Sequence, residues 1–388
     1  MKKAIALAFA LVVAIGATAA AFAKPTAKAS ASATTAVSCD KAKIAMIAPL
    51  TGVVGFLGQA QLAWAKYAVK TLNPSLGLKV QLLEGDMQLD SSVAATLAQK
   101  YVGDPSVMAI IGPSTSGGVV AVGPILAQAK LAAIGNSATR ASLTKGDNRI
   151  QSFWRVTADD SVQGTGDAKY MIKLGAKKVV VIDDQETYST GLADYAGNYL
   201  KKKGVTVSRE SISQSVTDFS SLVTKVPGDA DFVFLPWQIA QNGQTFAQQM
   251  AEQGKRARIF GSDGLDDAAF KVKGALVSAF SPDVATVPAA KSIVAGWLKD
   301  NPGKTPGSFG PPSYGAANVA LVAIQKACKA KNGKITRADV YSRMNSVRIK
   351  NWFLGGSFRF STKTHDPLNG NFYIFQLNGD GTKKQVSP

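Results

Sequence analysis

Two short stretches of the chain place small hydroxyl residues and glycine directly after apolar runs. The first run, residues 107–111, leads into Gly-Pro-Ser-Thr-Ser-Gly at 112–117, and the second, residues 131–134, leads into Asn-Ser-Ala-Thr at 136–139. Free backbone N–H groups at the start of a helix, together with hydroxyl groups, can hold a small anion without a lysine or arginine. A helix-compatible segment follows residues 112–117, so we expect this loop to bind an anion such as a carboxylate.

The surrounding sequence predicts the elements that bring these loops together. Strand and helix patterns alternate from Lys43 onward, in one series up to residue 134 and in a second over residues 178–260. Such alternation favours parallel sheets, whose strands end at a shared edge where ligands bind. We therefore expect an α/β protein with two Rossmann-like parallel-sheet lobes. A helix-rich part after residue 282 and strand-like segments near the end predict several crossovers between the lobes, and hence a hinge.

The N-terminal residues predict export. Lys2 and Lys3 precede an apolar stretch, and Ala21-Phe22-Ala23 forms an A-x-A cleavage site, which together are typical of a secretory signal peptide over residues 1–23. Residues 24–39 are low in complexity and almost without large side chains, so we expect a flexible linker. The remaining length exceeds the size of one hydrophobic core. We assign residues 40–157 plus 283–350 to lobe I and residues 158–282 plus 351–388 to lobe II.

Composition excludes several kinds of chemistry. The formal net charge is +18, but the basic residues are scattered and lack interleaved aromatic residues, which argues against a nucleic-acid partner and for a solvated basic surface. The one histidine, His365, and two distant cysteines cannot form a His–Cys zinc site, and no phosphate-binding glycine motif occurs. Asp183-Asp184 and Asp266-Asp267 leave carboxylate-pair catalysis open, although we interpret them as loop and cap residues. We expect no enzyme activity, no metal and no cofactor.

The two cysteines, Cys39 and Cys328, have two interpretations. An exported protein meets an oxidising compartment, so a disulfide between them would fix the N-terminus to a late helix. The alternative is a lipid-modified Cys39. Residues 36–38, Ala-Val-Ser, form a poor lipidation motif and lie too far past the apolar stretch, so we expect the disulfide.

Several further stretches occur in a characteristic order. They are Ile-Ala-Pro-Leu-Thr-Gly at 47–52 with Gly58, Asp-Met-Gln at 86–88, Ile-Gly-Pro-Ser-Thr-Ser at 111–116, Trp-Arg-Val-Thr at 154–157 with Gln163-Gly164, Asp-Gln-Glu-Thr-Tyr at 184–188 with Gly191, and Gly-Ser-Asp-Gly at 261–264. In this order and spacing the chain resembles the exported branched-chain amino acid binding proteins of ABC transporters, over nearly all of residues 41–388. The resemblance implies the type I periplasmic binding protein fold.

The resemblance also implies roles for matched residues. Ser116 would meet the carboxylate of an α-amino acid, and Ser137 and Thr139 would meet its carboxylate and amine. Tyr188 would close over the ligand from the second lobe, and Asp263 would pair with the ammonium group. Plainer interpretations remain for each: a helix cap for Ser116, turn residues for Thr139 and Asp263, and an aromatic residue packed on its own lobe for Tyr188.

The residues expected around the ligand side chain depart from the family pattern. These expected side-chain contacts are Leu57, Ser114, Thr115, Trp237, Gln238 and Phe309. Leu57 stands where the family often has an aromatic residue, and Ser114 and Thr115 are more polar than a leucine-selective pocket requires. An amino acid ligand is therefore better supported than a branched aliphatic side chain. The family also includes binders of amides, urea-like compounds and aromatic acids.

We interpret the protein as a periplasmic or otherwise extracytoplasmic solute-binding protein, a monomer that delivers an amino acid to a membrane ABC permease. A ligand sensor that signals to a partner protein by the same closure is the alternative. Neighbouring permease and ATPase genes, or uptake lost on deletion, would distinguish transport from sensing.

Overall fold

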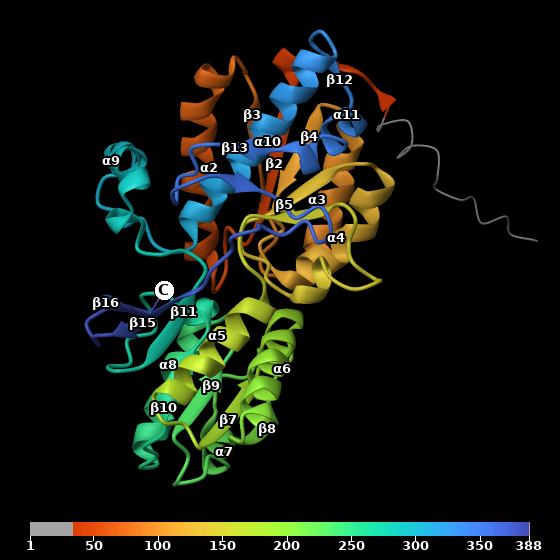
Figure 1. Cartoon of the computed structure of the whole chain (residues 1–388). Helices are drawn as coiled ribbons and strands as arrows, with labels where there is room; N and C mark the ends of the chain where they lie inside the picture. The colour runs from red at the N-terminus through yellow and green to blue at the C-terminus, as the bar shows by residue number, and fades with distance from the viewer. Residues whose placement is uncertain (1–33, 388) are drawn as a thin grey trace, which may run out of the picture.

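The computed structural model describes residues 34–387 and shows two α/β lobes, which lie one above the other in Figure 1. The predicted signal peptide, residues 1–23, and most of the predicted linker lie outside these residues. Between residues 34 and 387, no helix has the length and apolar character needed to cross a membrane. Each lobe is built on one large sheet composed mostly of parallel strands, which confirms the predicted fold class.

Lobe I contains a parallel sheet with the strand order β3-β2-β4-β5-β6. Its strands are β2 (Lys43–Ala48), β3 (Gln81–Asp86), β4 (Val107–Ile111), β5 (Ala132–Gly135) and β6 (Phe153–Arg155). Helices α2 (Gly55–Leu76) and α10 (Gly310–Ala330) cover one face, and α3 (Ser91–Gly103) and α4 (Ser116–Gln128) cover the other. The smaller helices α9 (Lys291–Asp300) and α11 (Arg337–Tyr341) complete the lobe (Figure 1).

Strand β2 shows why helices must cover both faces of this sheet. Ile44 and Met46 belong to the core formed with α2 and α10, whereas Ala45 and Ile47 belong to the core formed with α3 and α4. Successive side chains of a strand point to opposite faces, so an uninterrupted apolar strand needs a buried environment on both sides. The apolar runs that predict these strands therefore also require the helical layers.

Lobe II repeats this arrangement and adds an antiparallel edge. Its sheet has the order β16-β15-β11-β10-β9-β7-β8, in which β15 and β16 run antiparallel to their neighbours. The strands are β7 (Lys178–Asp183), β8 (Thr206–Ser211), β9 (Phe232–Leu235), β10 (Arg258–Gly261), β11 (Leu276–Ala279), β15 (Tyr373–Leu377) and β16 (Lys383–Ser387). The helices are α5 (Asp160–Lys173), α6 (Thr187–Lys202), α7 (Ser220–Thr224) and α8 (Ala240–Glu252). The sequence pattern did not predict β6, β11 or β16.

The chain passes between the lobes through residues 156–159, 280–283 and 361–372. The last passage begins later than the expected boundary at residue 350, because β14 (Phe358–Arg359) pairs with β13 (Arg348–Ile349). Trp352 and Phe360 also pack into the core of lobe I. Together the three segments form the hinge between the lobes.

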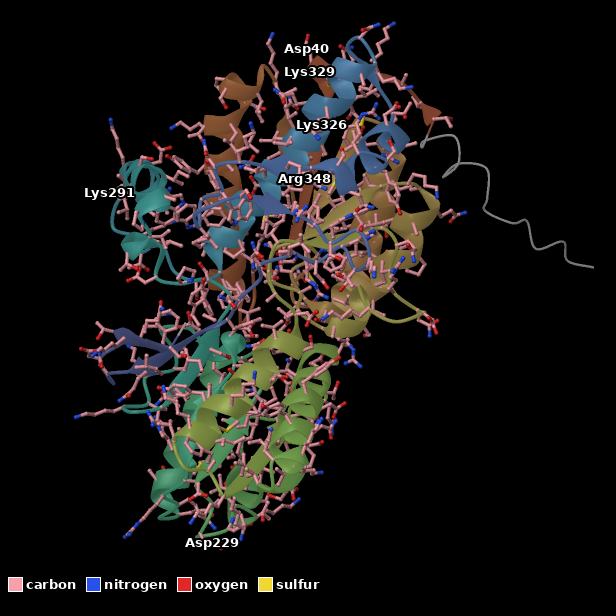
Figure 2. The ribbon with its side chains drawn as sticks, in the orientation of Figure 1. Asp40, Asp229, Lys291, Lys326, Lys329 and Arg348 are labelled. Atoms are coloured by element: carbon pink, nitrogen blue, oxygen red, sulfur yellow. A yellow bond between two sulfur atoms is a disulfide. The ribbon has the colours of Figure 1, made fainter. Side chains whose placement is uncertain are left out.

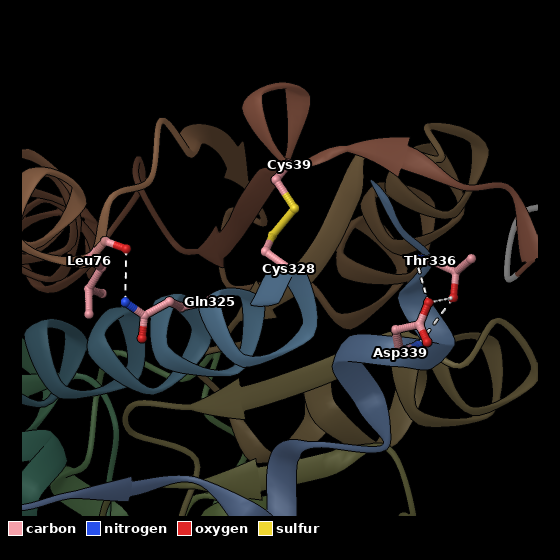
Figure 3. Close-up of a disulfide and its surroundings, with 6 residues drawn as sticks. All are labelled: Cys39, Leu76, Gln325, Cys328, Thr336 and Asp339. Atoms are coloured by element: carbon pink, nitrogen blue, oxygen red, sulfur yellow. Dashed lines mark hydrogen bonds between the residues drawn. A yellow bond between two sulfur atoms is a disulfide. The ribbon is translucent and has the colours of Figure 1, made fainter. Parts of the chain in front are cut away.

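The N-terminal part of lobe I is fixed by the predicted disulfide, which is confirmed. Cys39 and Cys328 are bonded, and this joins the start of the folded chain to the last turns of α10 (Figure 3). Strand β1 (Val37–Ser38) pairs with β12 (Lys334–Ile335), so the last residues of the expected linker already belong to the folded lobe.

Basic residues on lobe I lie singly or in small groups: Figure 2 shows Lys291 and Arg348 apart from each other, and Lys326 and Lys329 close together near the end of α10. Lys291, Lys329 and Arg348 are exposed and Lys326 is half-buried. Among these four residues none forms an ion pair with a described carboxylate, and Lys326 and Arg348 donate hydrogen bonds to nearby backbone carbonyl groups. This distribution agrees with the expected solvated basic surface.

Candidate functional site

The candidate site lies where the two sheets face each other, at the point where each changes its winding direction. In lobe I, β3 and β4 lie on opposite sides of β2, and in lobe II, β8 and β9 lie on opposite sides of β7. The loops after such neighbouring strands separate and leave a crevice at the carboxyl edge of a sheet. Pro49 and Ser114 follow the two central strands of lobe I, and Tyr188 and Gln238 follow those of lobe II. All four line one cavity between the lobes.

The loop of lobe I that the sequence predicts to bind an anion lies, as expected, at the N-terminus of a helix. Thr115, rather than Ser116, is the N-cap of α4, since its hydroxyl group accepts a hydrogen bond from the Gly118 N–H at 3.1 Å. Ser116 is the first residue of the helix, and its Oγ accepts a hydrogen bond from the Arg140 N–H at 3.2 Å. This arrangement joins the loops after β4 and β5, and the N-terminus of α4 faces the cavity. An anion is favoured at such a position.

Gln61 of α2 holds the two serines of lobe I in one hydrogen-bond ring. Ser114 Oγ donates to Gln61 Oε1 at 2.7 Å, and Gln61 Nε2 donates to Ser137 Oγ at 2.9 Å. Ser137 Oγ in turn donates to the Ser114 carbonyl group at 2.7 Å. The ring is buried, and both of its hydroxyl groups already form hydrogen bonds within the protein. The polarity of Ser114 and Ser137 therefore serves to shape the wall and does not by itself require a polar ligand side chain.

Lobe II presents one carboxyl group, Asp263, to the same cavity. Tyr188 donates a hydrogen bond to Asp263 Oδ1 at 2.5 Å, and Gln163 Nε2 donates to the same oxygen. Burial raises the pKa of Asp263 to about 6, although these two hydrogen bonds favour its ionised form. Tyr188 thus fixes the carboxyl group as well as lining the cavity.

Two more buried carboxyl groups lie behind Asp263 on one face of α5. Asp160 and Asp167 occupy this face with Gln163, at the spacing that places side chains along one side of a helix. Gln163 also donates to Ser278 at 2.9 Å, and Ser278 donates to Asp167 at 3.0 Å. Burial raises the pKa of Asp160 to about 8 and that of Asp167 well above its usual range. A buried acid of raised pKa stays neutral up to a higher pH than an exposed one, so these groups limit the negative charge behind Asp263.

Arg140 connects the two halves of the site. Its backbone contacts Ser116 in lobe I, while its Nη1 donates to the Thr187 carbonyl group and to Thr190 Oγ1 of α6 in lobe II. The absence of a side chain at Gly191 permits this contact, because a β-carbon there would lie 3.1 Å from Arg140 Nη1. Arg140 therefore links the two lobes next to the helical turn that carries Tyr188.

The cavity brings together most of the predicted site residues. Its lining includes Leu57, Ser114, Thr115, Ser116, Ser137, Tyr188, Gln238, Asp263 and Phe309. It is small, about 40 Å³, because side chains of both lobes approach each other closely. The remaining wall is formed by Pro49, Val54, Gln61, Leu89 and Gly264. Most of the side chains on the lobe I side of this wall are apolar.

Two predicted residues lie outside this lining. Trp237 is buried in the core of lobe II, where its Nε1 donates to the Ile182 carbonyl group at 2.8 Å and its ring packs against Phe219 and Phe246. Thr139 is fully buried, and its carbonyl group accepts the N–H of Asp160 at 2.9 Å. Thr139 is thus placed behind the cavity, where it joins lobe I to the start of α5.

Gln61 and Gln163 were not among the residues expected at the site. Gln61 lies one helical turn after Leu57, on the same face of α2, and this spacing was the available indication. Gln163 is in the stretch that resembles the family, but only the folded chain places it against Asp263.

The carboxylate pairs lie outside the cavity and have other partners. Asp183 accepts hydrogen bonds from Arg209 and Ser211, and Asp266 pairs with Lys383. His365 is buried against the ring of Trp154, with centroids 4.4 Å apart, and burial lowers its pKa. These groups have structural partners and do not converge on the candidate site. Within residues 34–387, no group of histidine, cysteine, aspartate and glutamate has the arrangement of a metal site.

Comparison with known proteins identifies the family of this chain. Residues 41–383 match the model of the periplasmic binding protein family. A Leu/Ile/Val-binding protein homologue of Brucella melitensis is 30% identical over 297 residues, which are 73% of this chain and 78% of that protein. A leucine-, isoleucine-, valine-, threonine- and alanine-binding protein of Pseudomonas aeruginosa is 26% identical over 91% of this chain and 94% of its own length. The crystal structure of a leucine binding protein from Thermotoga maritima has a TM-score of 0.80 and 24% identity, covering 89% of this chain and 98% of that one. The last similarity concerns the fold.

Proposed function

Because the chain belongs to the periplasmic binding protein family, we propose that it binds an α-amino acid between its lobes. The family consists of binding proteins and is not a class of enzymes. The single observation that carries the proposal is that a group suited to an anion and a group suited to a cation lie on opposite sides of one cavity. The N-terminus of α4 with Ser116 suits a carboxylate, and the buried carboxyl group of Asp263 suits an ammonium group.

The wall beside these groups favours an aliphatic side chain. Val54, Leu57, Leu89 and Phe309 contribute apolar surface to the cavity. The serine hydroxyl groups of the Gln61 ring are already hydrogen-bonded within the protein, so an apolar ligand group would leave none of them unsatisfied. The relative from Brucella melitensis is named for leucine, isoleucine and valine, and the one from Pseudomonas aeruginosa for these, alanine and threonine, which supports the same choice.

The remaining parts of the role follow from the family and from the N-terminal sequence. Membership places the protein outside the cytoplasm, and we propose that residues 1–23 are the signal peptide that directs export. Binding closes the lobes because the ligand contacts both of them, and the closed monomer delivers the amino acid to a membrane ABC permease. Ser116, Ser137, Tyr188 and Asp263 are the proposed ligand contacts.

Thermal unfolding with a ligand panel tests this proposal. The protein, refolded to remove carried-over ligand, is heated with aliphatic, polar and acidic L-amino acids, and with amides, urea analogues and aromatic acids. A ligand at about 100 times its dissociation constant adds about 2.7 kcal/mol to stability. Stabilisation by aliphatic amino acids is the expected result. Stabilisation confined to compounds without an amine would contradict the role of Asp263.

A further inference from the structure

A second cavity, of about 300 Å³, lies at the hinge itself. All three hinge segments contribute to its wall: Val156 and Thr157 from the first, Phe280 from the second, and residues 367–371 from the third. The loop from Trp352 to Arg359 forms the remaining side. Any change in the angle between the lobes must alter the positions of these segments relative to one another. A molecule bound in this hinge cavity would therefore contact the parts of the chain that move.

The polar side chains of the hinge cavity differ from those of the cleft in having few partners. Within residues 34–387, the side chains of Ser357, Arg359, Asn369 and Asn371 form no hydrogen bond or ion pair, and all four are exposed. Thr157 is 2% exposed, and its Oγ1 has no hydrogen-bond partner in the described part of the chain. The four exposed side chains are consequently available to a ligand without breaking an existing interaction.

The charge and shape of the wall indicate which ligand would fit. Arg359 supplies a guanidinium group, and neither aspartate nor glutamate occurs in the lining. The rings of Trp352 and Phe358, stacked with centroids 4.3 Å apart, and the half-buried Tyr373 provide flat apolar surface beside it. Guanidinium and amide N–H groups next to rings are complementary to a carboxylate attached to a flat or apolar body.

A packed aromatic cluster connects the hinge cavity with the cleft. Phe280 and Ala158 line the hinge cavity, and they form one small core with Phe309, Phe372 and Leu57. Phe280 and Phe309 meet edge to face, with centroids 5.1 Å apart. Phe309 and Leu57 line the amino acid cavity. A shift of Phe280 therefore reaches the cleft wall through direct packing.

We propose that the hinge cavity is a second binding site, for a small organic carboxylate with a flat or apolar body, and that its occupation changes the affinity of the cleft. The site itself is independent of the proposed function, whereas its effect on the cleft depends on an amino acid ligand. Because binding at two coupled sites is reciprocal, the amino acid changes the carboxylate affinity by the same factor.

Calorimetric titration of the full chain with benzoate, cyclohexanecarboxylate and neutral benzamide tests the site. We expect the carboxylates to bind and benzamide to bind at least tenfold more weakly, since a hydrogen bond to a charged group contributes about 1.5–3 kcal/mol. Arg359→Met should reduce carboxylate affinity by about tenfold or more. Arg348→Met is the matched control, because Arg348 pairs with Arg359 across two strands but is absent from the cavity lining (Figure 2). The carboxylate affinity of Arg348→Met should equal that of the wild type.

Two further variants distinguish binding in the hinge cavity from binding in the cleft. Ser357→Trp fills the exposed rim of the hinge cavity and should abolish carboxylate binding, whereas Ser116→Ala should leave it unchanged. Dissociation constants weaker than about 10 mM for both carboxylates, or binding lost only in Ser116→Ala, would overturn the proposal.

The coupling is measured by titrating the amino acid found in the thermal panel with and without saturating benzoate. A changed affinity in the wild type that disappears in Arg359→Met supports the proposal. Hinge binding without such a change would refute the coupling but not the second site. If no amino acid binds at all, the proposed function fails, while the carboxylate titrations still decide the fate of the hinge site.

Discussion

The two cavities between the lobes use polar side chains in different ways. In the cleft, Gln61 joins Ser114 and Ser137 in a ring, and Tyr188 and Gln163 hold Asp263, so the wall is fixed by the protein's own hydrogen bonds. In the hinge cavity, the polar side chains around Arg359 have no partners within residues 34–387. The cleft wall is therefore preorganised before a ligand binds, whereas the polar side chains of the hinge wall are free to reorient.

Loss of the Asp263 charge should have the largest effect on the cleft. Asp263→Asn keeps the size of the side chain but leaves an ammonium ligand buried without its counter-charge, which should weaken amino acid binding by about 2–5 kcal/mol. Calorimetry provides the measurement. Asp267→Asn is the matched control, since Asp267 accepts the N–H of Ala269 and is absent from the cleft lining. An equal affinity for wild type and Asp263→Asn would remove this carboxyl group from the site.

Removal of the Arg140 contact should weaken binding through closure. Arg140→Met loses hydrogen bonds from a charged donor to α6, which should lower amino acid affinity by about 1.5–3 kcal/mol and mainly accelerate release. Stopped-flow fluorescence gives the rates, and small-angle scattering reports the fraction of closed molecules. Arg343→Met removes a similar bond to the Asp339 carbonyl group within lobe I and should leave closure unchanged. Identical scattering and release rates for both variants would argue against Arg140 as an interlobe contact.

Disruption of the Gln61 ring tests whether the cleft is preorganised. Gln61→Leu leaves the hydroxyl groups of Ser114 and Ser137 without their amide partner, at a cost of about 1–3 kcal/mol in the free energy of unfolding or of binding. Chemical denaturation and calorimetry separate the two. Gln59→Leu, at an exposed position of the same helix, is the control. If Gln61→Leu behaves like this control, the ring does not organise the wall, and the contrast with the hinge disappears.

The acid dependence of the cleft should be the smallest effect. Burial raises the pKa of Asp263 to about 6, so its charge, and with it ammonium binding, should be lost as the pH falls through 6. The change is at most about 1.4 kcal/mol for each pH unit. The free energy of unfolding without ligand should change in the opposite direction. The folded-state pKa values of Asp160, Asp167 and Asp263 are raised, so protonation of these groups favours the folded state. The protein without ligand should therefore become less stable as the pH rises. Thermal unfolding and calorimetry from pH 5 to 8 would show the opposite slopes; parallel slopes would contradict the buried-carboxyl interpretation.

Much of the fold was accessible from local patterns. The apolar runs at β2, β4 and β7 predicted buried parallel strands because each run requires two covered faces. Strand β6, with only Phe153–Arg155, was missed because a segment of this length has no periodicity to read. Strands β11 and β16 were missed as well. Residues 351–360 were assigned to lobe II because the pairing of β14 with β13 is not encoded in the local pattern.

The site, like the fold, was predicted only in part from the sequence. The hydroxyl loop around Ser116 indicated a carboxylate site, and the resemblance to the family implied an ammonium site at Asp263; both residues line the cavity. Trp237 stands at a predicted contact position, but its large ring gains more by packing beside Phe219 and Phe246 in the core of lobe II. A position in sequence therefore did not determine the direction of the side chain.

By itself, the sequence determined the class of the protein: alternating βα units, hydroxyl loops after two strands, two cysteines that pair, and an order of short stretches characteristic of the family. Only the tertiary structure decided which groups meet. Gln163 and Asp263 are 100 residues apart in the chain, and Arg140 reaches α6 across the cleft. The hinge cavity exists only where three segments and one loop converge. Local propensities depend on neighbouring residues, whereas these contacts depend on how whole lobes pack, and no short stretch carries that information.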